Sequence, residues 1–101
     1  MTELVFSVSV EELCQCEEFS QQLIVEVVEH GIAHPMAGQE VVDWVFDTTS
    51  VHWLRKAVRL HSDLEIDWVA VAMVIELLQK NEALEKQNKH IEQQLKRFLE
   101  Y

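Results

Sequence analysis

The stretch QQLIVEVVEHG, residues 21–31, decides the fold, because its apolar residues recur at the spacing of an amphipathic helix. Ser20 stands before it as an N-cap residue, and Gly31 is the residue type that ends helices. On a helical wheel, an arc of about 140° collects the apolar side chains expected to face a core. These are Leu23, Ile24, Val27 and Val28. The residues off this arc, expected at the surface, are Gln22, Val25, Glu26 and Glu29.

Upstream of this helix, the pattern predicts a short strand that runs into another helix. Apolar residues alternate with serines over residues 6–10, which is typical of a half-buried strand. Ser9 and Glu12 have the S-x-x-E spacing of a capping box, which places a helix over residues 10–16. With a turn near residues 17–19, the two helices are expected to form a helix-turn-helix, whose second helix is the usual recognition helix.

Downstream, the chain's one proline and both glycines fall in GIAHPMAG, residues 31–38, which predicts a loop. VVDWVFD, residues 41–47, favours a strand, and we expect it to pair back on residues 32–34 as a small hairpin or wing. Asp47 then caps a helix over residues 48–61. The inward side chains expected on this helix are Val51, Leu54 and Val58.

The last predicted helix changes character along its length. Asp67 caps it, and no Gly or Pro interrupts it from Trp68 to the C-terminus. Its first turns are dense in apolar residues and suit a helix packed into a core. These residues are Val69, Ala72, Met73, Val74 and Leu77. Further on, the apolar positions thin to a heptad, with Leu77, Leu84, Ile91 and Phe98 at d, and Val74, Asn81, Asn88 and Leu95 at a.

This heptad is the pattern of a coiled-coil seam, which would expose apolar residues to water without a partner helix. Asn81 and Asn88 in the seam favour one specific pairing. We therefore predict a homodimer; the alternative is a helix that folds back onto its own domain. The predicted dimerisation residues are Leu77, Leu84, Ile91, Leu95 and Phe98. Residues 1–66 would form a winged helix-turn-helix domain, and residues 67–101 a helix packed on it proximally and dimerising distally.

The net charge of −10 lies entirely in the first half of the chain. Residues 1–50 hold ten Asp or Glu and no Lys or Arg, whereas residues 51–101 hold eight of each sign. Nucleic-acid binding draws most of its affinity from Lys and Arg on phosphates, so a duplex should be repelled by this half. The distribution favours a basic protein partner and predicts no direct contact with nucleic acid.

No motif for catalysis, a cofactor or a metal is present in the sequence. Cys14 and Cys16 would lie on nearly opposite faces of a helix, and the five histidines lack the closely spaced pairs of zinc sites. No Ser-His-Asp or Cys-His set or phosphate loop is found, so we expect no enzyme. The N-terminal stretch lacks a basic leader, and no segment approaches the roughly 18 apolar residues of a membrane span. We expect a cytoplasmic protein without a membrane segment.

The order of the expected elements resembles the MerR-like winged-helix domain. That family's G-L-L-x-P falls on residues 31–35, with Gly31 and Pro35 in place. The positions of its three phosphate-facing arginines hold Val25, Ala37 and Trp44, and the tyrosine after the first is Glu26. The resemblance implies a mainly α winged helix-turn-helix with a small β-hairpin wing and a long C-terminal coiled-coil helix, without the family's DNA contacts.

A second resemblance covers almost the whole chain. VSVEELCQ (8–15), WVFD (44–47), AVRLHSDLEIDW (57–68) and LEKQNKHIEQQLKRF (84–98) are similar to the CbpM chaperone-modulator family. The dodecamer is the most specific of these matches. The resemblance implies an adaptor that binds and inhibits the J-domain of a CbpA-type, DnaJ-like co-chaperone. Such an adaptor keeps the co-chaperone from stimulating its DnaK (Hsp70) partner and can limit its DNA-associated activity.

The charge map predicts where a J-domain would bind. J-domains present a basic helix to Hsp70, so an inhibitor can offer a competing acidic surface. Glu26 and Glu29 lie one turn apart on an exposed edge of the helix, and apolar Val25 lies beside them. Glu40 and Asp43 lie in the expected wing. The predicted partner site consists of these two acids together with Val25, Glu26 and Glu29, and Met36 could add apolar contact.

Three alternatives remain open at this point. A MerR-type transcriptional regulator would agree with the order of elements, although the arginines are missing. A small-molecule sensor would use Trp44, Trp53 and Trp68 to line a pocket, although aromatic residues at such junctions are more often core. Finally, Arg55, Lys56 and Arg59 on one helix face could bind phosphate, although pairing with the acidic half or simple solvation explains them better.

Overall fold

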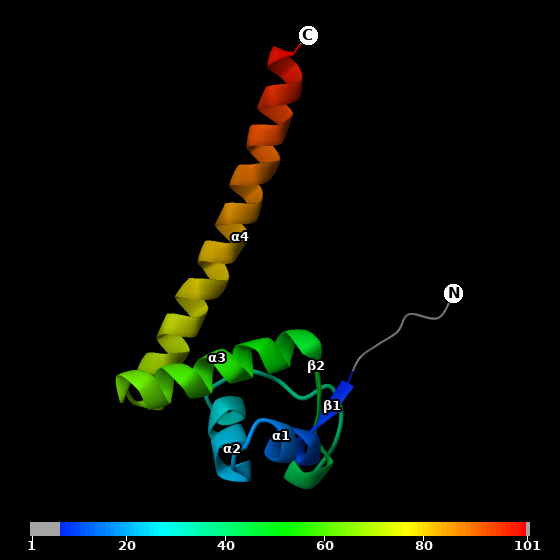
Figure 1. The fold of residues 1–101 in the computed structure, drawn as a ribbon, viewed down its shortest axis with the longest axis vertical. Helices are drawn as coiled ribbons and strands as arrows, with labels where there is room; N and C mark the ends of the chain where they lie inside the picture. Colours follow the sequence, from blue (N-terminus) through cyan, green and yellow to red (C-terminus); the bar gives the residue numbers. More distant parts are fainter. Residues whose placement is uncertain (1–6, 101) are drawn as a thin grey trace, which may run out of the picture.

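The computed structural model describes residues 7–100, and its elements follow the order of a winged helix-turn-helix (Figure 1). In chain order they are β1 (Ser7–Ser9), α1 (Val10–Cys16), α2 (Gln21–Glu29), the 3-10 turn η1 (Val41–Asp43), β2 (Val45–Asp47), α3 (Thr48–Leu64) and α4 (Trp68–Leu99). The predicted fold class is confirmed: residues 7–100 form four α-helices, of which the C-terminal one is long, and a small two-stranded sheet. Phe6, part of the predicted first strand, lies outside the described residues.

All four predicted N-caps are confirmed. Each cap is a hydrogen bond between residues three apart in the chain. At Ser9 the backbone N–H of Glu12 donates to Ser9 Oγ at 3.1 Å, and that hydroxyl, in place of the backbone N–H of Ser9 in a full capping box, donates to Glu12 Oε1 at 3.3 Å. The other caps accept a hydrogen bond from the backbone N–H three residues later. They are Ser20 before α2, Asp47 before α3 and Asp67 before α4.

Gly31 ends α2 in the way the sequence predicts. Its φ of +72° is left-handed, and its N–H donates to the Val28 carbonyl at 3.0 Å. The N–H of Ile32 donates to the Val27 carbonyl at 3.1 Å, which completes a Schellman motif. The turn carries Ile32 and Ala33 into the core, where they are 6% and 2% exposed. Hydrogen bonds therefore define both ends of α2, which occupies the place of the recognition helix.

The predicted partner of the wing strand is wrong. β2 pairs antiparallel with β1, with Val8 opposite Phe46, and not with residues 32–34. Ile32 and Ala33 are held in the core instead, and η1 shortens the strand to three residues. The loop meets β2 at Val45: the Ala37 carbonyl accepts from the Val45 N–H at 3.1 Å, and the Met36 N–H donates to the Val45 carbonyl at 2.7 Å.

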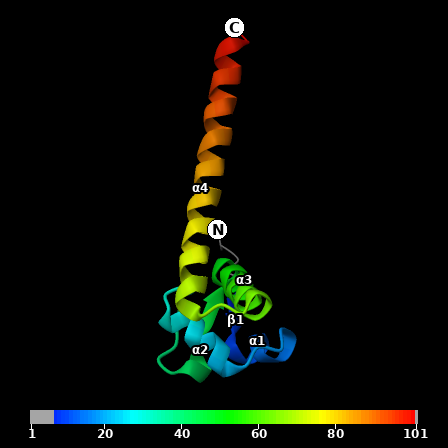
Figure 2. The same ribbon diagram turned by 90° about the vertical axis from the view of Figure 1, so that its left-hand side faces the viewer.

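The core lies where the first three helices, the sheet and the start of α4 meet (Figures 1 and 2). Phe46 of β2 and Leu54 of α3 are fully buried in it, together with Ile24 and Val27 of α2. Of the inward residues predicted for α2 and α3, all but Leu23 belong to this core or pack against it, and Leu23 is half-buried. Trp53 is 8% exposed, and Trp44 and Trp68 pack on the same core. The three tryptophans therefore contribute to the core of the fold.

The buried face of α4 differs from the expected one. Val71 and Ile75, at 0% and 2% exposure, pack into the core. Three residues expected there are instead exposed: Val69 (62%), Met73 (61%) and Leu77 (65%). Both faces of these turns are apolar, so periodicity alone does not choose between them, and packing against α3 decides.

The corner between α3 and α4 sets the direction of the long helix. α3 runs three residues beyond the predicted His61, to Leu64, and its C-cap Glu65 is left-handed with φ of +52°. The His61 ring stacks on Trp68 with centroids 4.0 Å apart and an interplanar angle of 13°. His61 Nδ1 lies 2.8 Å from the Ile66 carbonyl, and as the N–H tautomer it donates to that oxygen. From this corner α4 projects away from the body, as both views show.

Candidate functional site

The outer face of α2 carries three of the predicted partner-binding residues together. Ile24 and Val27 anchor the helix in the core, so the residues between and beyond them point away from it. Val25 is half-buried, the Glu26 side chain is 34% exposed and Glu29 is exposed. No Lys or Arg within residues 7–100 forms an ion pair with either acid. This face is acidic, with one apolar residue beside the acids.

Glu26 also contacts the end of its own helix. His30 Nδ1 lies 2.8 Å from the Glu26 carbonyl and 3.6 Å from its carboxylate Oε2. The Nδ1–H tautomer donates to the carbonyl, and the carboxylate contact becomes an ion pair only when the imidazole is protonated. His30, at the end of α2, is therefore in direct contact with the acidic face of that helix.

The two predicted wing acids lie elsewhere on the body. Glu40 precedes η1 and Asp43 ends it, and both are exposed. η1 packs against α1, so the predicted site comes from two places, the outer face of α2 and a turn that lies on α1. Val42 lies between the two acids and is 63% exposed, which gives the turn an apolar residue that sequence reasoning missed. Met36, which could add apolar contact, is 46% exposed.

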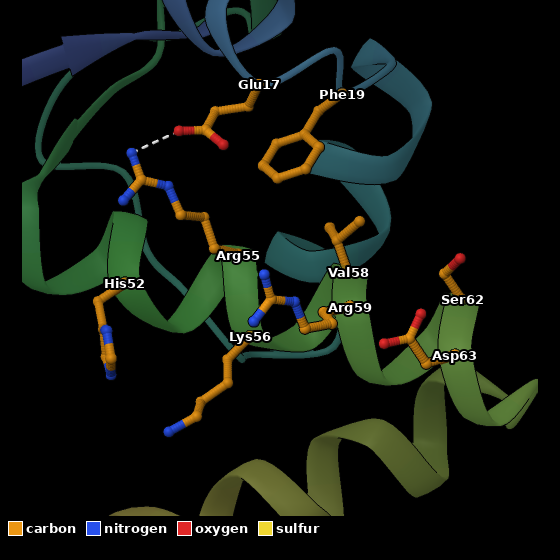
Figure 3. Close-up of a pocket in the computed structure, with 9 residues that line it drawn as sticks. All are labelled: Glu17, Phe19, His52, Arg55, Lys56, Val58, Arg59, Ser62 and Asp63. Atoms are coloured by element: carbon orange, nitrogen blue, oxygen red, sulfur yellow. Dashed lines mark ion pairs between the residues drawn. The ribbon is translucent and has the colours of Figure 1, made fainter.

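The basic residues of α3 line a separate groove, called here the α3 groove (Figure 3). Its volume is about 400 Å³, and Phe19 and Val58 form its apolar wall. Arg55 pairs with Glu17 at 2.5 Å, which confirms pairing with the acidic half for this residue. Lys56 Nζ lies 5.5 Å from the Trp53 ring centroid, a cation–π contact. Arg59 also lines the groove.

A second groove, the α2–α4 groove, lies where the end of α2 meets the first turns of α4. Its volume is about 380 Å³. His30, Gly31 and Ile32 form one side, and no Lys or Arg lines it. The residues contributed by α4 are Val69, Ala72, Met73, Ile75, Glu76 and Gln79. The sequence held a signal for this groove, because Val69 and Met73 fall outside the a and d positions of the heptad.

The predicted dimerisation residues form an exposed apolar stripe along α4. Leu77, Leu84, Ile91, Leu95 and Phe98 are 51% to 76% exposed. Every residue from 81 to 100 is exposed, and α4 extends away from the body in both views (Figures 1 and 2). The described part of the helix does not fold back onto its own domain, and the stripe faces solvent over a helix of 32 residues.

The described part of the chain shows neither a cluster of metal-ligating side chains nor a helix that could span a membrane. Within residues 7–100, no group of three or more metal-ligating side chains converges. Cys14 is partly buried and Cys16 is exposed, both as free thiols. Among the described helices, none combines the length and the apolar character needed to cross a bilayer.

Comparison with known proteins identifies similar chains of nearly the same length. Residues 8–93 match the model of the MerR HTH family regulatory proteins. The chain is 36% identical over 97 residues to the chaperone modulatory protein CbpM of Pseudomonas putida, covering 96% of this chain and 95% of that protein. It is 38% identical over 95 residues to CbpM of Pseudomonas entomophila, covering 94% and 93%. Identity to CbpM of Citrobacter koseri is 29% over 101 residues, covering 100% and 99%.

Proposed function

The chain belongs to the CbpM family of chaperone modulatory proteins, on the MerR-type helix-turn-helix scaffold, and on this premise we propose that it binds a J-domain. The J-domain is that of a CbpA- or DnaJ-type co-chaperone, and binding inhibits its co-chaperone activity and can limit its DNA binding. The name of these relatives, chaperone modulatory protein, supports a regulatory role for this chain. In this proposal the protein acts in the cytoplasm as an adaptor, not as an enzyme.

The outer face of α2 is the observation that carries this proposal. A DNA-reading helix needs Lys or Arg to neutralise phosphates, whereas this one shows Val25, Glu26 and Glu29. Acidic groups around an apolar contact match a basic helix, because complementary charges steer the encounter and the apolar residue adds buried contact. Glu40 and Asp43 supply a second acidic contact from η1.

We propose further that the protein acts as a homodimer through the stripe on α4. The exposed residues at heptad positions supply an apolar seam that another copy of the same helix matches. Asn81 and Asn88 are exposed within the seam and would fix its register.

Charge reversal on α2 tests the proposed J-domain site. The variant Glu26→Lys/Glu29→Lys should bind a purified J-domain more weakly by well over about 1 kcal/mol, mainly through slower association at low salt. The matched control, Glu82→Lys/Glu100→Lys, makes the same change in net charge at exposed positions in α4 and at its C-cap, away from the site. Stopped-flow and equilibrium binding measure both. Equal affinities for the two variants and the wild type would place the site elsewhere.

The match to the MerR family supports a second candidate function, that of a MerR-type DNA-binding regulator. Its scaffold is present, and the α3 groove offers Arg55, Lys56 and Arg59. The acidic first half opposes it, since a duplex would meet ten acids and no base there. A gel shift with random duplex at low salt separates the candidates, because a DNA binder would show salt-sensitive, non-specific binding.

A further inference from the structure

The α2–α4 groove carries an apolar surface that the domain leaves uncovered. Val69 and Met73 are 62% and 61% exposed, as much as the residues of the dimerisation stripe. Ala72 and Ile32 continue the apolar lining toward the core. Large apolar side chains grouped in a groove, with polar residues at the rim, are typical of a contact surface for a partner.

Dimerisation through the heptad does not cover this groove. When Leu77, Leu84, Ile91 and Phe98 occupy d, Val69 falls at c and Met73 at g. The other α4 residues of the groove fall at b, c and f, and none falls at a or d. Positions b, c and f face away from the partner in a two-stranded coiled coil, and g lies at the edge of its seam, so most of the groove stays open in the proposed dimer.

The charges around the groove select the kind of partner. Glu76 lines it, and His30 on the opposite side lies 3.6 Å from the Glu26 carboxylate. Lys80 pairs with Glu76 at 3.3 Å, but both side chains are about two-thirds exposed (68% and 66%), and such pairs contribute little. The α3 groove differs in sign, because three of its lining residues are Arg or Lys. Of the two grooves, only the α2–α4 groove suits a cationic partner.

The acidic face of α2 is continuous with this groove through His30. The imidazole lines the groove and its Nδ1 lies 3.6 Å from the Glu26 carboxylate. A helix lying in the groove would therefore place its basic side chains near Glu76 and, past His30, near Glu26. Its apolar side chains would cover Val69 and Met73.

We propose that the α2–α4 groove is the docking site of an amphipathic basic helix of the partner protein, with Val69 and Met73 as its apolar floor and Glu76 on its rim. This inference rests on the proposed function and locates the contact surface of that same interaction. It moves the centre of the interface from the outer face of α2 to the junction of α2 and α4, and it leaves the acids of α2 as flanking contacts.

Two single substitutions, each with a matched control, test the groove. Met73→Lys places a cation on the apolar floor, and its control is Leu64→Lys, at a residue 59% exposed outside the groove. Glu76→Lys reverses a rim charge, and its control is Glu82→Lys, at an exposed residue further along the same helix. Titration calorimetry with a purified J-domain of a DnaJ-type co-chaperone measures binding, and sedimentation verifies that each variant keeps the wild-type mass.

We expect the dissociation constant to rise at least tenfold for Met73→Lys and for Glu76→Lys, and to stay within twofold for the two controls. If both groove variants bind like the wild type while Glu26→Lys/Glu29→Lys binds weakly, the groove is not the site and the proposed function stands. If the wild-type protein binds no J-domain at low salt, the proposed function fails and this inference fails with it.

Discussion

The two parts of α4 use their apolar residues for different purposes. In residues 68–80, Val71 and Ile75 are buried against the body, while Val69 and Met73 on another face stay open. In residues 81–99 every side chain is exposed, although the apolar residues recur with a regular heptad. One continuous helix therefore holds a folding surface, a groove wall and the proposed dimerisation seam. Which residues belong to which is decided by the neighbouring elements and not by their hydrophobicity.

The largest effect in this comparison is expected at the buried proximal face. Ile75→Ala removes a side chain that is 2% exposed in the core and leaves a cavity there. We expect the free energy of unfolding to fall by about 2–5 kcal/mol. Urea unfolding at fixed protomer concentration measures it, since a dimer's stability depends on concentration. A loss below about 0.5 kcal/mol would show that α4 is not held by this face.

A distal substitution should change association and leave the body folded. Leu84→Lys puts a charge at a d position that is 60% exposed in the single chain. We expect the dissociation constant of the dimer to rise at least about a hundredfold, roughly 2.7 kcal/mol. Analytical ultracentrifugation at tens of micromolar gives the mass. A wild-type chain that sediments as a monomer there would remove the proposed dimer, and a dimeric Leu84→Lys variant would move its seam.

The smallest effect is expected at the start of α4, where neither surface is involved. Asp67 Oδ1 accepts a hydrogen bond from the Ala70 N–H at 2.8 Å. Asp67→Ala should lower the free energy of unfolding by about 1 kcal/mol, because the helix loses its N-cap. The matched variant Asp67→Asn keeps an acceptor and should retain most of that stability. If the two variants unfold alike and like the wild type, the cap does not stabilise the helix.

The features that the sequence predicts well are local. Four N-caps and the turn at Gly31 depend on residues within one or two helical turns, so spacing and residue type suffice to place them. The pairing of β2 with β1 is different, because residues 7–9 and 45–47 are far apart in the chain. A strand pattern predicts that a segment is extended but does not identify the strand it pairs with. The predicted partner, residues 32–34, is close in the chain but is not the strand that pairs with β2.

In the candidate site, too, the sequence predicts the local features but not the contacts between distant segments. Helical periodicity places Val25, Glu26 and Glu29 on the outer face of α2, and the structure agrees. It does not indicate that η1 lies on α1, since that contact joins residues about thirty positions apart along the chain. The α2–α4 groove depends on two helices meeting, and the sequence marks only its α4 side, through Val69 and Met73.

A titration of the wild-type protein with a purified J-domain, at low and at raised ionic strength, tests the central claim most directly. The acidic first half has no Lys or Arg, so attraction to a basic helix should weaken as salt screens it. We predict a saturable complex whose dissociation constant rises with salt. No complex at low salt, together with salt-sensitive binding of random duplex DNA, would contradict the account and favour a DNA-binding regulator.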